Sequence, residues 1–295
     1  MTPSVPFAER RIIIMKERRF IIDTTLRDGE QRPGICFRKE DKVFIASVLD
    51  NLHVYEIEAG SPCLGKEECE GIRKIVENKK NSLVSVWSRM NVKDIQIALT
   101  CNPDVIHIGA PVSYVQIYSK LKKNKSWMMK TLCESIELAL LHKTAVTVGF
   151  EDASRADVGF LITLAKKLQD YKVKIRLSDT VGVMTPDRTK AMVEEILSHA
   201  FVELEIHGHN DLGMAVANSL EAAKAGAKYI DCTLFGIGER SGNCNFYDFV
   251  KIGKQIFDLG MEAHHVFEAQ QRIREWFERA GKEYNYARAN CNLTK

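Results

Sequence analysis

The stretch KIRLSDTVGVMTPDRTKAMVEEILSH, residues 174–199, contains one complete unit of the pattern that decides the fold. Lys174–Ser178 is a short run with strand character, and Pro186–His199 is an amphipathic helical stretch. Pro186 lies in the first turn of that helix, where proline is tolerated. We therefore predict a strand, a polar loop and a helix in this order.

The same unit recurs along the chain in both directions. Further strands are predicted at Phe20–Thr24, Tyr55–Ala59, Leu83–Ser88, Val105–Gly109, Ala145–Phe150, Val202–His207 and Tyr229–Leu234. Helical stretches between them include Glu40–Leu52, Lys66–Asn78, Trp127–His142, Val158–Tyr171, Ala215–Ala225 and Phe246–Phe257. Eight strand–helix units in about 260 residues are typical of an α/β fold of the (β/α)8 TIM-barrel type. A doubly wound open sheet is the alternative, but no GxGxxG follows the first strand.

The predicted elements divide the chain into three parts. Residues 1–19 form an N-terminal extension, residues 20–260 form the catalytic barrel, and residues 261–295 form a C-terminal helix and a polar tail. The helix of the last part is predicted at Phe267–Ala280, where it would pack on the barrel.

Composition excludes several classes of protein. The 295 residues carry a net charge of +3, whereas nucleic-acid binders usually present a much more basic face. The sequence contains no run of eighteen or more apolar residues, so no membrane span is predicted. The N-terminus lacks the apolar core of a signal peptide. The eight cysteines are scattered without a CxxC pair, as expected for free thiols in a reducing cytoplasm.

A basic cluster lies in the middle of the chain at Lys120, Lys122, Lys123 and Lys125. It is either a solvated face or a landing site for an anionic ligand, such as the phosphates of a coenzyme.

The active site of a TIM barrel lies at the C-terminal ends of its strands. The polar residues predicted at these ends are Arg27, Asp28, Glu58, Arg89, Glu151, Asp152, Asp179, Thr180, His207, His209, Glu239, Arg240 and Asn243. This end of the barrel is therefore predicted to carry the chemistry.

His207 and His209 are the strongest pair of candidate metal ligands. Strand side chains alternate, so positions i and i+2 point the same way and both imidazoles can face one barrel mouth. Two imidazoles and a carboxylate suit a divalent metal with open positions for substrate. Asp28 is the natural third ligand; Asp23 is the competitor, but it lies earlier on its strand and is expected to brace the site. The alternative is two histidines in an ordinary loop.

The other candidates have both a chemical and a structural interpretation. Arg27 can stabilise an enolate or a developing alkoxide, or it can form a surface ion pair. Glu151 can move protons at a carbon next to a carbonyl, or it can cap the next helix. Thr180 can donate its hydroxyl to a substrate carboxylate, or it can cap a turn. Glu58 and Arg89 are expected to contact the substrate.

Asn243 ends the glycine-rich loop GIGERSGN, residues 236–243. Its side chain could add an oxygen ligand to the metal, while the glycines permit close approach of the backbone to a ligand.

Three long motifs together resemble the DRE-TIM metallolyase superfamily: DTTLRDGEQ (23–31), HGHNDLGMAVAN (207–218) and GIGERSGN (236–243). The resemblance covers roughly residues 20–260. It implies a TIM barrel, an enolate-type mechanism and one divalent metal ion (zinc, magnesium or manganese). Asp28, His207 and His209 would hold this ion, with Asn243 nearby.

Within that superfamily the sequence looks most like the isopropylmalate, citramalate and homocitrate synthases. EDASRAD (151–157) matches their strand-5 acid motif and DTVG (179–182) their carboxylate-binding segment, which implies roles for Glu151 and Thr180. VWSRMN (86–91) and residues 108–129 look closest to the nitrogen-fixation type of homocitrate synthase. The resemblance therefore implies an acyltransferase that condenses acetyl-CoA with a 2-oxo acid. 2-Oxoglutarate is favoured, 2-oxoisovalerate and pyruvate are the alternatives, and a homodimer is expected.

One departure from the family pattern concerns the region after the barrel. These synthases carry a further helical subdomain with a catalytic histidine, and no matching segment precedes Lys295. His264 and His265 lie too close behind the barrel to take that role. The chain is then a truncated synthase, one half of a split synthase with a companion subunit, or an enzyme that needs no such base.

Four functions rival this one, and the third of them, a biotin-dependent carboxyltransferase, is set aside. A 3-hydroxy-3-methylglutaryl-CoA-type lyase would need a cysteine within the glycine-rich loop, whereas Cys244 follows it. EDASRAD counts against a 4-hydroxy-2-oxo acid aldolase, and LSDTVG lacks the lysine of the biotin-dependent carboxyltransferases. A non-catalytic subunit is the fourth.

Overall fold

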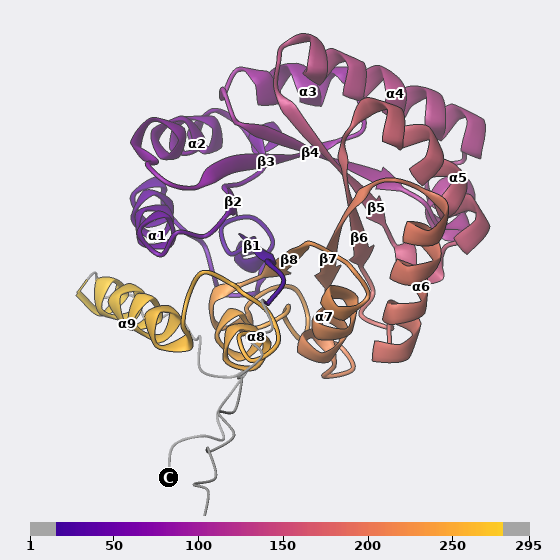
Figure 1. Ribbon diagram of the computed structural model, residues 1–295. Coiled ribbons are helices and arrows are strands. Elements are labelled where there is room, and N and C mark those ends of the chain that lie inside the picture. The colour runs from indigo at the N-terminus through magenta and orange to yellow at the C-terminus, as the bar shows by residue number, and fades with distance from the viewer. Residues whose placement is uncertain (1–15, 280–295) are drawn as a thin grey trace, which may run out of the picture.

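A computed structural model describes residues 16–279 and contains a closed barrel of eight parallel strands in the order β1 to β8 (Figure 1). The strands are β1 (Phe20–Asp23), β2 (Glu56–Glu58), β3 (Leu83–Arg89), β4 (Val105–Pro111), β5 (Ala145–Glu151), β6 (Lys174–Asp179), β7 (Glu203–Gly208) and β8 (Tyr229–Cys232). The predicted (β/α)8 barrel is confirmed, and each predicted strand overlaps an observed one.

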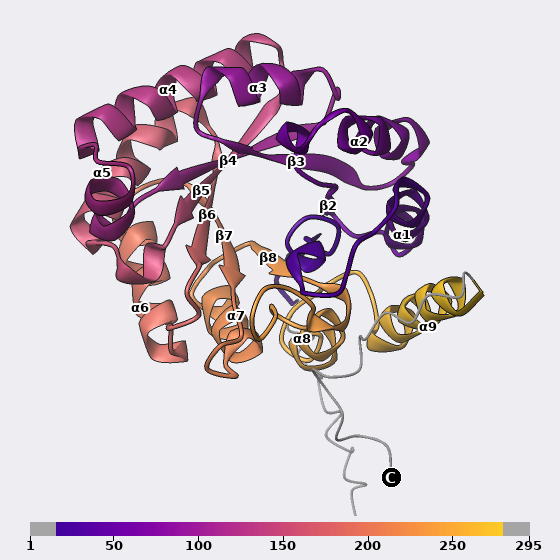
Figure 2. The same ribbon diagram turned by 180° about the vertical axis from the view of Figure 1, so that it is seen from behind.

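The helices form a ring around the strands (Figures 1 and 2). They are α1 (Lys39–Asn51), α2 (Lys66–Asn78), α3 (Val92–Leu99), α4 (Lys125–Leu141), α5 (Val158–Leu168), α6 (Pro186–His199), α7 (Ala215–Lys224), α8 (Phe246–Gly253) and α9 (Ala263–Arg279). The eight-residue helix α3 was not among the predicted stretches. Among the described residues, no helix is both long and apolar enough to cross a membrane.

The C-terminal helix α9 packs on the outside of the ring against α1. The Trp276 ring stacks on Phe44 with centroids 4.2 Å apart, and its indole N–H donates to Asp41 Oδ1 over 3.1 Å. A C-terminal packing helix was predicted, although it begins earlier than expected. Residues 1–15 of the predicted extension and residues 280–295 of the predicted tail lie outside the described residues.

The interior of the barrel is ionic rather than apolar. Lys174 Nζ on β6 donates to Glu56 Oε2 on β2 over 2.8 Å, so the two side chains meet across the barrel. Arg176, which has no exposed surface, pairs with Glu58 at 2.6 Å and also with Glu205 on β7. Buried charges of this kind are tolerated only when they are paired. The barrel interior therefore supports the side chains at its C-terminal mouth through ion pairs.

Gly149 on β5 makes room for two functional side chains. A Cβ at this position would lie 2.3 Å from His107 Nε2 and 3.0 Å from Glu151 Oε1. Gly149→Ala should therefore lower the free energy of unfolding by about 1–3 kcal/mol, the usual cost of overpacking. Denaturant unfolding measures this change.

Gly71→Ala in α2 is the matched control, because its Cβ would meet Lys39 Cγ at an ordinary 3.6 Å. Alanine there should stabilise the helix by about 0.5–1 kcal/mol. Equal stability of the Gly149→Ala variant and the unchanged protein would show that β5 has more room than the structure gives it.

Candidate metal centre and active site

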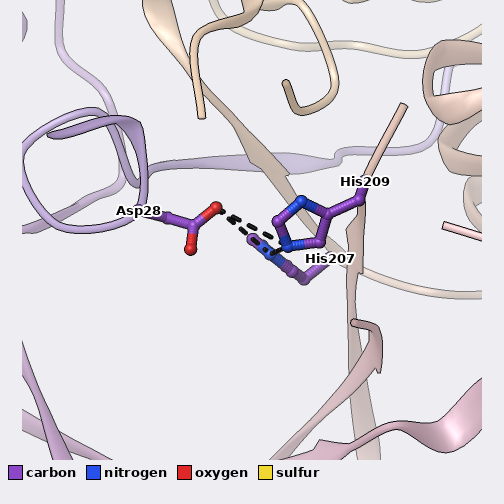
Figure 3. A group of neighbouring side chains, drawn as sticks. All are labelled: Asp28, His207 and His209. Atoms are coloured by element: carbon purple, nitrogen blue, oxygen red, sulfur yellow. Dashed lines mark hydrogen bonds and ion pairs between the residues drawn. The ribbon is translucent and has the colours of Figure 1, made fainter. Parts of the chain in front are cut away.

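Asp28, His207 and His209 converge at the C-terminal mouth of the barrel, as Figure 3 shows. His207 Nε2 lies 3.4 Å from His209 Nε2, and Asp28 Oδ2 lies 3.7 Å and 3.8 Å from these two nitrogens. Asp28 follows β1, His207 is on β7 and His209 is the first residue after β7. The two histidines are two residues apart, so both rings project to the same side, as predicted.

The spacing of these three atoms fits a metal ion. A point equidistant from all three lies about 2.1 Å from each, which is the usual length of zinc–nitrogen and zinc–oxygen bonds. His207 Nδ1 is hydrogen-bonded to Asp231 Oδ2 at 3.0 Å, which leaves the lone pair of Nε2 for the cluster. Such a carboxylate behind a histidine is typical of metal ligands.

The protonation states of the three groups also suit metal binding. Burial lowers the pKa of His207, and burial together with the neighbouring His207 lowers the pKa of His209 to about 4. Burial alone would raise the pKa of Asp28, but Arg27 and the two histidines outweigh it and bring the pKa to about 2. Near neutral pH the cluster therefore offers two neutral imidazoles and a carboxylate, the forms that bind metals.

Asn243 lies against the same cluster. Its Nδ2 donates to Asp28 Oδ2 over 2.7 Å and to Ile237 O over 2.9 Å, whereas its buried Oδ1 has no hydrogen-bond partner among the described residues. Asp23, the competing carboxylate, instead accepts hydrogen bonds from the backbone N–H and hydroxyl of Thr25 at 2.9 and 3.0 Å. Asp23 therefore braces the turn that carries Asp28 and is not part of the cluster.

Arg27 is fixed beside the cluster by two carboxylates. Its Nη1 donates to Asp28 Oδ1 over 2.7 Å and its Nε donates to Glu58. Glu58, which we expected to contact the substrate, is completely buried beneath Arg27, where it also pairs with Arg176 and His107. Burial alone would raise the pKa of Glu58, but the neighbouring charges, those of Arg176 and Arg27 above all, outweigh burial and hold this pKa well below its usual range.

A cavity of about 650 Å³ opens above the cluster. It brings together most of the predicted site residues: Arg27, Asp28, Arg89, Glu151, Thr180, His207, His209 and Glu239. Glu58 and Asn243 are not among the lining residues. A volume of this size suits a small ligand.

Glu151 and Thr180 form a hydrogen-bonded pair on the cavity wall. The Thr180 hydroxyl donates to Glu151 Oε2 over 3.3 Å and accepts the Asp152 N–H over 2.9 Å. Burial raises the pKa of Glu151 above that of a free glutamate.

Arg89, in contrast, is largely exposed and its Nε donates to Asp94 Oδ2 over 2.6 Å. Glu151 thus has the environment of a proton-transfer group, and Arg89 lies at the cavity edge.

Asp231 and Arg176 belong to the surroundings of the cluster but were not predicted from the sequence. Asp231 links His207 to Arg176, because its Oδ2 accepts a hydrogen bond from His207 Nδ1 and lies 3.0 Å from Arg176 Nε. The available signal was a charged residue between two apolar neighbours, in IDC of β8 and in IRL of β6.

Comparisons with known proteins show which proteins the chain is similar to. A family model described as HMGL-like matches residues 18–273. The homocitrate synthase subunit alpha of Clostridium pasteurianum is 44% identical over 261 residues, which is 86% of this chain and 96% of that protein. A 2-isopropylmalate synthase of Caldanaerobacter subterraneus is 37% identical over 86% of this chain and 67% of its own. Among solved structures, the HMG-CoA lyase of Bacillus subtilis superposes with a TM-score of 0.80 over 95% of this chain and 99% of its own. At 18% identity that last likeness concerns the fold alone.

Proposed function

Because the chain belongs to the HMGL-like family of DRE-TIM barrels, we propose that it condenses acetyl-CoA with a 2-oxo acid at a divalent metal ion. Its relatives named homocitrate synthase and isopropylmalate synthase are acyltransferases, and the chain is an enzyme. The observation that carries the proposal is the cluster of Asp28, His207 and His209 at the floor of a cavity that Arg27 and Glu151 also line.

The proposed metal ligands are Asp28, His207 and His209, with Asn243 as a neighbour through Asp28. A divalent ion held there would act as a Lewis acid on the carbonyl oxygen of the 2-oxo acid and would orient this substrate. The ligand set is compatible with zinc, magnesium or manganese.

The protein side chains divide the remaining work. Arg27 is held rigidly by Glu58 and Asp28, so its guanidinium can stabilise the negative charge that develops on the ketone oxygen. Glu151 is buried and carries a raised pKa, which suits a group that exchanges a proton near neutral pH. Thr180 orients Glu151 and lies beside it on the cavity wall, where it could also reach a substrate carboxylate.

The favoured oxo acid is 2-oxoglutarate, with 2-oxoisovalerate and pyruvate as alternatives. The relative named homocitrate synthase subunit alpha supports this choice. A second support is charge, because Arg27 and Arg89 both line the cavity and a dicarboxylate would find more than one cation.

We also propose that a companion polypeptide completes the acetyl-CoA side of the site. Among the described residues, the histidines that line the cavity are the two cluster ligands. His265 instead lines a separate pocket between α1 and α9. The Clostridium pasteurianum relative is itself named a subunit, and the match covers 96% of its length.

Cys244 weighs against lyase chemistry at this site. Its side chain is completely buried, its Sγ lies 3.8 Å from Cys232 Sγ, and it does not line the cavity. A catalytic cysteine would have to reach the substrate.

Asp231→Asn should lower the affinity for the metal about 10–100-fold, the usual effect of losing a hydrogen-bonded carboxylate behind a ligand. The reason is that Asp231 holds the Nδ1–H of His207 and so directs Nε2 at the ion. Competition with a chromophoric chelator measures the affinity. Asp211→Asn is the control, because Asp211 pairs with Arg240 at the rim and touches no ligand. Unchanged affinity in Asp231→Asn would remove the proposed role of Asp231.

The proposed reaction is tested with acetyl-CoA labelled with ¹³C at its methyl carbon. Condensation converts the labelled methyl group into a methylene group bonded to a new tertiary alcohol carbon, which NMR identifies. The assay includes 2-oxoglutarate, 2-oxoisovalerate and pyruvate, and it is run on the chain alone and on the assembly purified from its native source. Labelled product with one oxo acid would support the proposal. No product in either arm, together with cleavage of 3-hydroxy-3-methylglutaryl-CoA, would contradict it.

A further inference from the structure

A patch of uncompensated positive charge lies beside the cavity. Residues 115–133, between β4 and the middle of α4, contain five lysines and no aspartate or glutamate. Lys120, Lys122 and Lys123 are exposed, and within residues 16–279 none of them forms an ion pair with a carboxylate. Some exposed lysines elsewhere do, for example Lys224 with Glu221 and Lys228 with Glu203, each at 2.6 Å. We call Lys120, Lys122 and Lys123 the lysine rim.

The backbone holds the lysine rim in place. The Leu121 N–H donates to Gln116 O and the Lys123 N–H donates to Ile117 O, both over 3.0 Å. Lys122 between them has a left-handed backbone with φ of 54°, a conformation that L-residues seldom adopt. The next residue, Asn124, caps α4 by accepting the Trp127 N–H over 2.8 Å. The three ammonium groups therefore project from a fixed turn.

Lys125 is only partly exposed and is not part of the lysine rim, whereas Lys123 stays exposed although its Nζ lies 5.4 Å from the centroid of the Trp127 ring. The Lys125 Nζ lies 4.1 Å from the centroid of Phe160 and 4.9 Å from that of Tyr114, so Lys125 packs on aromatic rings. These contacts anchor the start of α4 beneath the rim.

The lysine rim joins the cavity of the proposed metal site through Lys120, the member of the rim that lines it. Lys120, Leu121 and Trp127 line the same cavity as Glu151 and His207. One wall of this cavity is therefore a continuous path from the proposed reaction centre to the ammonium groups.

Exposed aromatic rings lie next to the lysine rim. Tyr114 is 57% exposed and Tyr118 is 42% exposed, and their rings stack with centroids 5.3 Å apart. A surface that combines ammonium groups with exposed aromatic faces suits a ligand with both phosphates and a flat base. A small oxo acid has neither of these groups.

We propose that the lysine rim binds the phosphate groups of the coenzyme A nucleotide, while the pantetheine arm runs past Leu121 and Trp127 toward Glu151. This inference rests on the proposed use of acetyl-CoA. Each exposed lysine–phosphate pair is weak alone, but several pairs act on one multiply charged ligand. Both a nucleotide and a free phosphate ion could bind to these ammonium groups through phosphate oxygens. A nucleotide should bind more tightly, because its base makes additional contacts.

The experiment is isothermal titration of the chain with coenzyme A, with adenosine 3′,5′-bisphosphate and with inorganic phosphate. The test variant is Lys122→Gln/Lys123→Gln. The control variant is Lys143→Gln/Lys172→Gln, which removes the same charge from two exposed lysines that also have left-handed backbones. These control residues lie just before β5 and β6, at the opposite end of the barrel.

The lysine-rim variant should bind coenzyme A and adenosine 3′,5′-bisphosphate about tenfold more weakly, as expected from the loss of two screened ion pairs. The control variant should bind both as the unchanged protein does, and the difference should shrink as salt is added. Inorganic phosphate should bind much more weakly than the nucleotide.

Equal affinity of the lysine-rim variant and the unchanged protein would overturn the inference, as would equal binding of inorganic phosphate and the nucleotide. Neither result touches the proposed reaction, which the labelled-product assay decides separately. Lysine-dependent binding of coenzyme A, without condensation product even from the assembly purified from its native source, would support the inference and count against the proposed reaction.

Discussion

Asp28→Asn and His207→Ala should each yield a folded protein that retains no stoichiometric metal and forms no measurable condensation product. His207→Ala removes one of three ligand atoms that lie 3.4–3.8 Å from one another, and Asp28→Asn replaces the only charged ligand of this set by a neutral amide. Loss of the Lewis acid removes several kcal/mol of transition-state stabilisation, so activity should fall more than about 10³-fold. Metal analysis of the purified variants and the labelled-product assay measure the two effects.

The fold should survive these changes. In Asp28→Asn the side chain keeps its shape and Arg27 keeps its ion pair with Glu58. Asp23→Asn is the matched control, since Asp23 is equally buried but binds Thr25 outside the cluster. Asp23→Asn should keep the metal, whereas one metal ion per chain in Asp28→Asn would show that the ligand set is wrong.

Glu151→Gln should keep the metal and the oxo acid but lose turnover by about 10²–10⁴-fold, the usual contribution of a general acid–base group. The amide oxygen can still accept the Thr180 hydroxyl, so the shape of the site is preserved. The amide cannot exchange the proton that the buried carboxyl, with its raised pKa, is suited to move. Comparing kcat with the dissociation constant of the oxo acid separates proton transfer from binding.

Glu239→Gln is the control for Glu151→Gln. Glu239 lines the same cavity, but its carboxylate pairs with Arg240 at 2.8 Å at the exposed edge. Its replacement should change kcat little. Full turnover by Glu151→Gln would reduce Glu151 to a structural residue at the end of β5.

The barrel was predictable because each unit repeats a strong local pattern. The strand Lys174–Asp179 and the helix Pro186–His199 occur almost where the sequence placed them. The range of helix α3 was not given from the sequence, because eight residues span only about two turns, too few for a helical period to stand out. The local sequence pattern was thus sufficient to predict the order of the elements, but not the position of the short helix α3.

The cluster of Asp28, His207 and His209 could also be anticipated, because parallel strands end on one rim of the barrel. The positions of Glu58 and Arg176 could not. The Glu58 side chain on β2 points into the barrel, as predicted for a site residue, but it lies below the cavity floor. There Arg176 from β6 reaches it across the barrel. That pairing depends on how the barrel closes, and one strand's sequence carries no information about a partner four strands away.

Metal-dependent binding of the 2-oxo acid tests the central claim most directly. Calorimetric titration of 2-oxoglutarate, 2-oxoisovalerate and pyruvate would compare the metal-free chain with the chain after a divalent ion is restored. At least one oxo acid should bind the metal-loaded chain and none should bind the metal-free chain or Asp28→Asn. Equal binding with and without the metal, or no binding to the metal-loaded chain, would contradict the claim that Asp28, His207 and His209 build the site of the reaction.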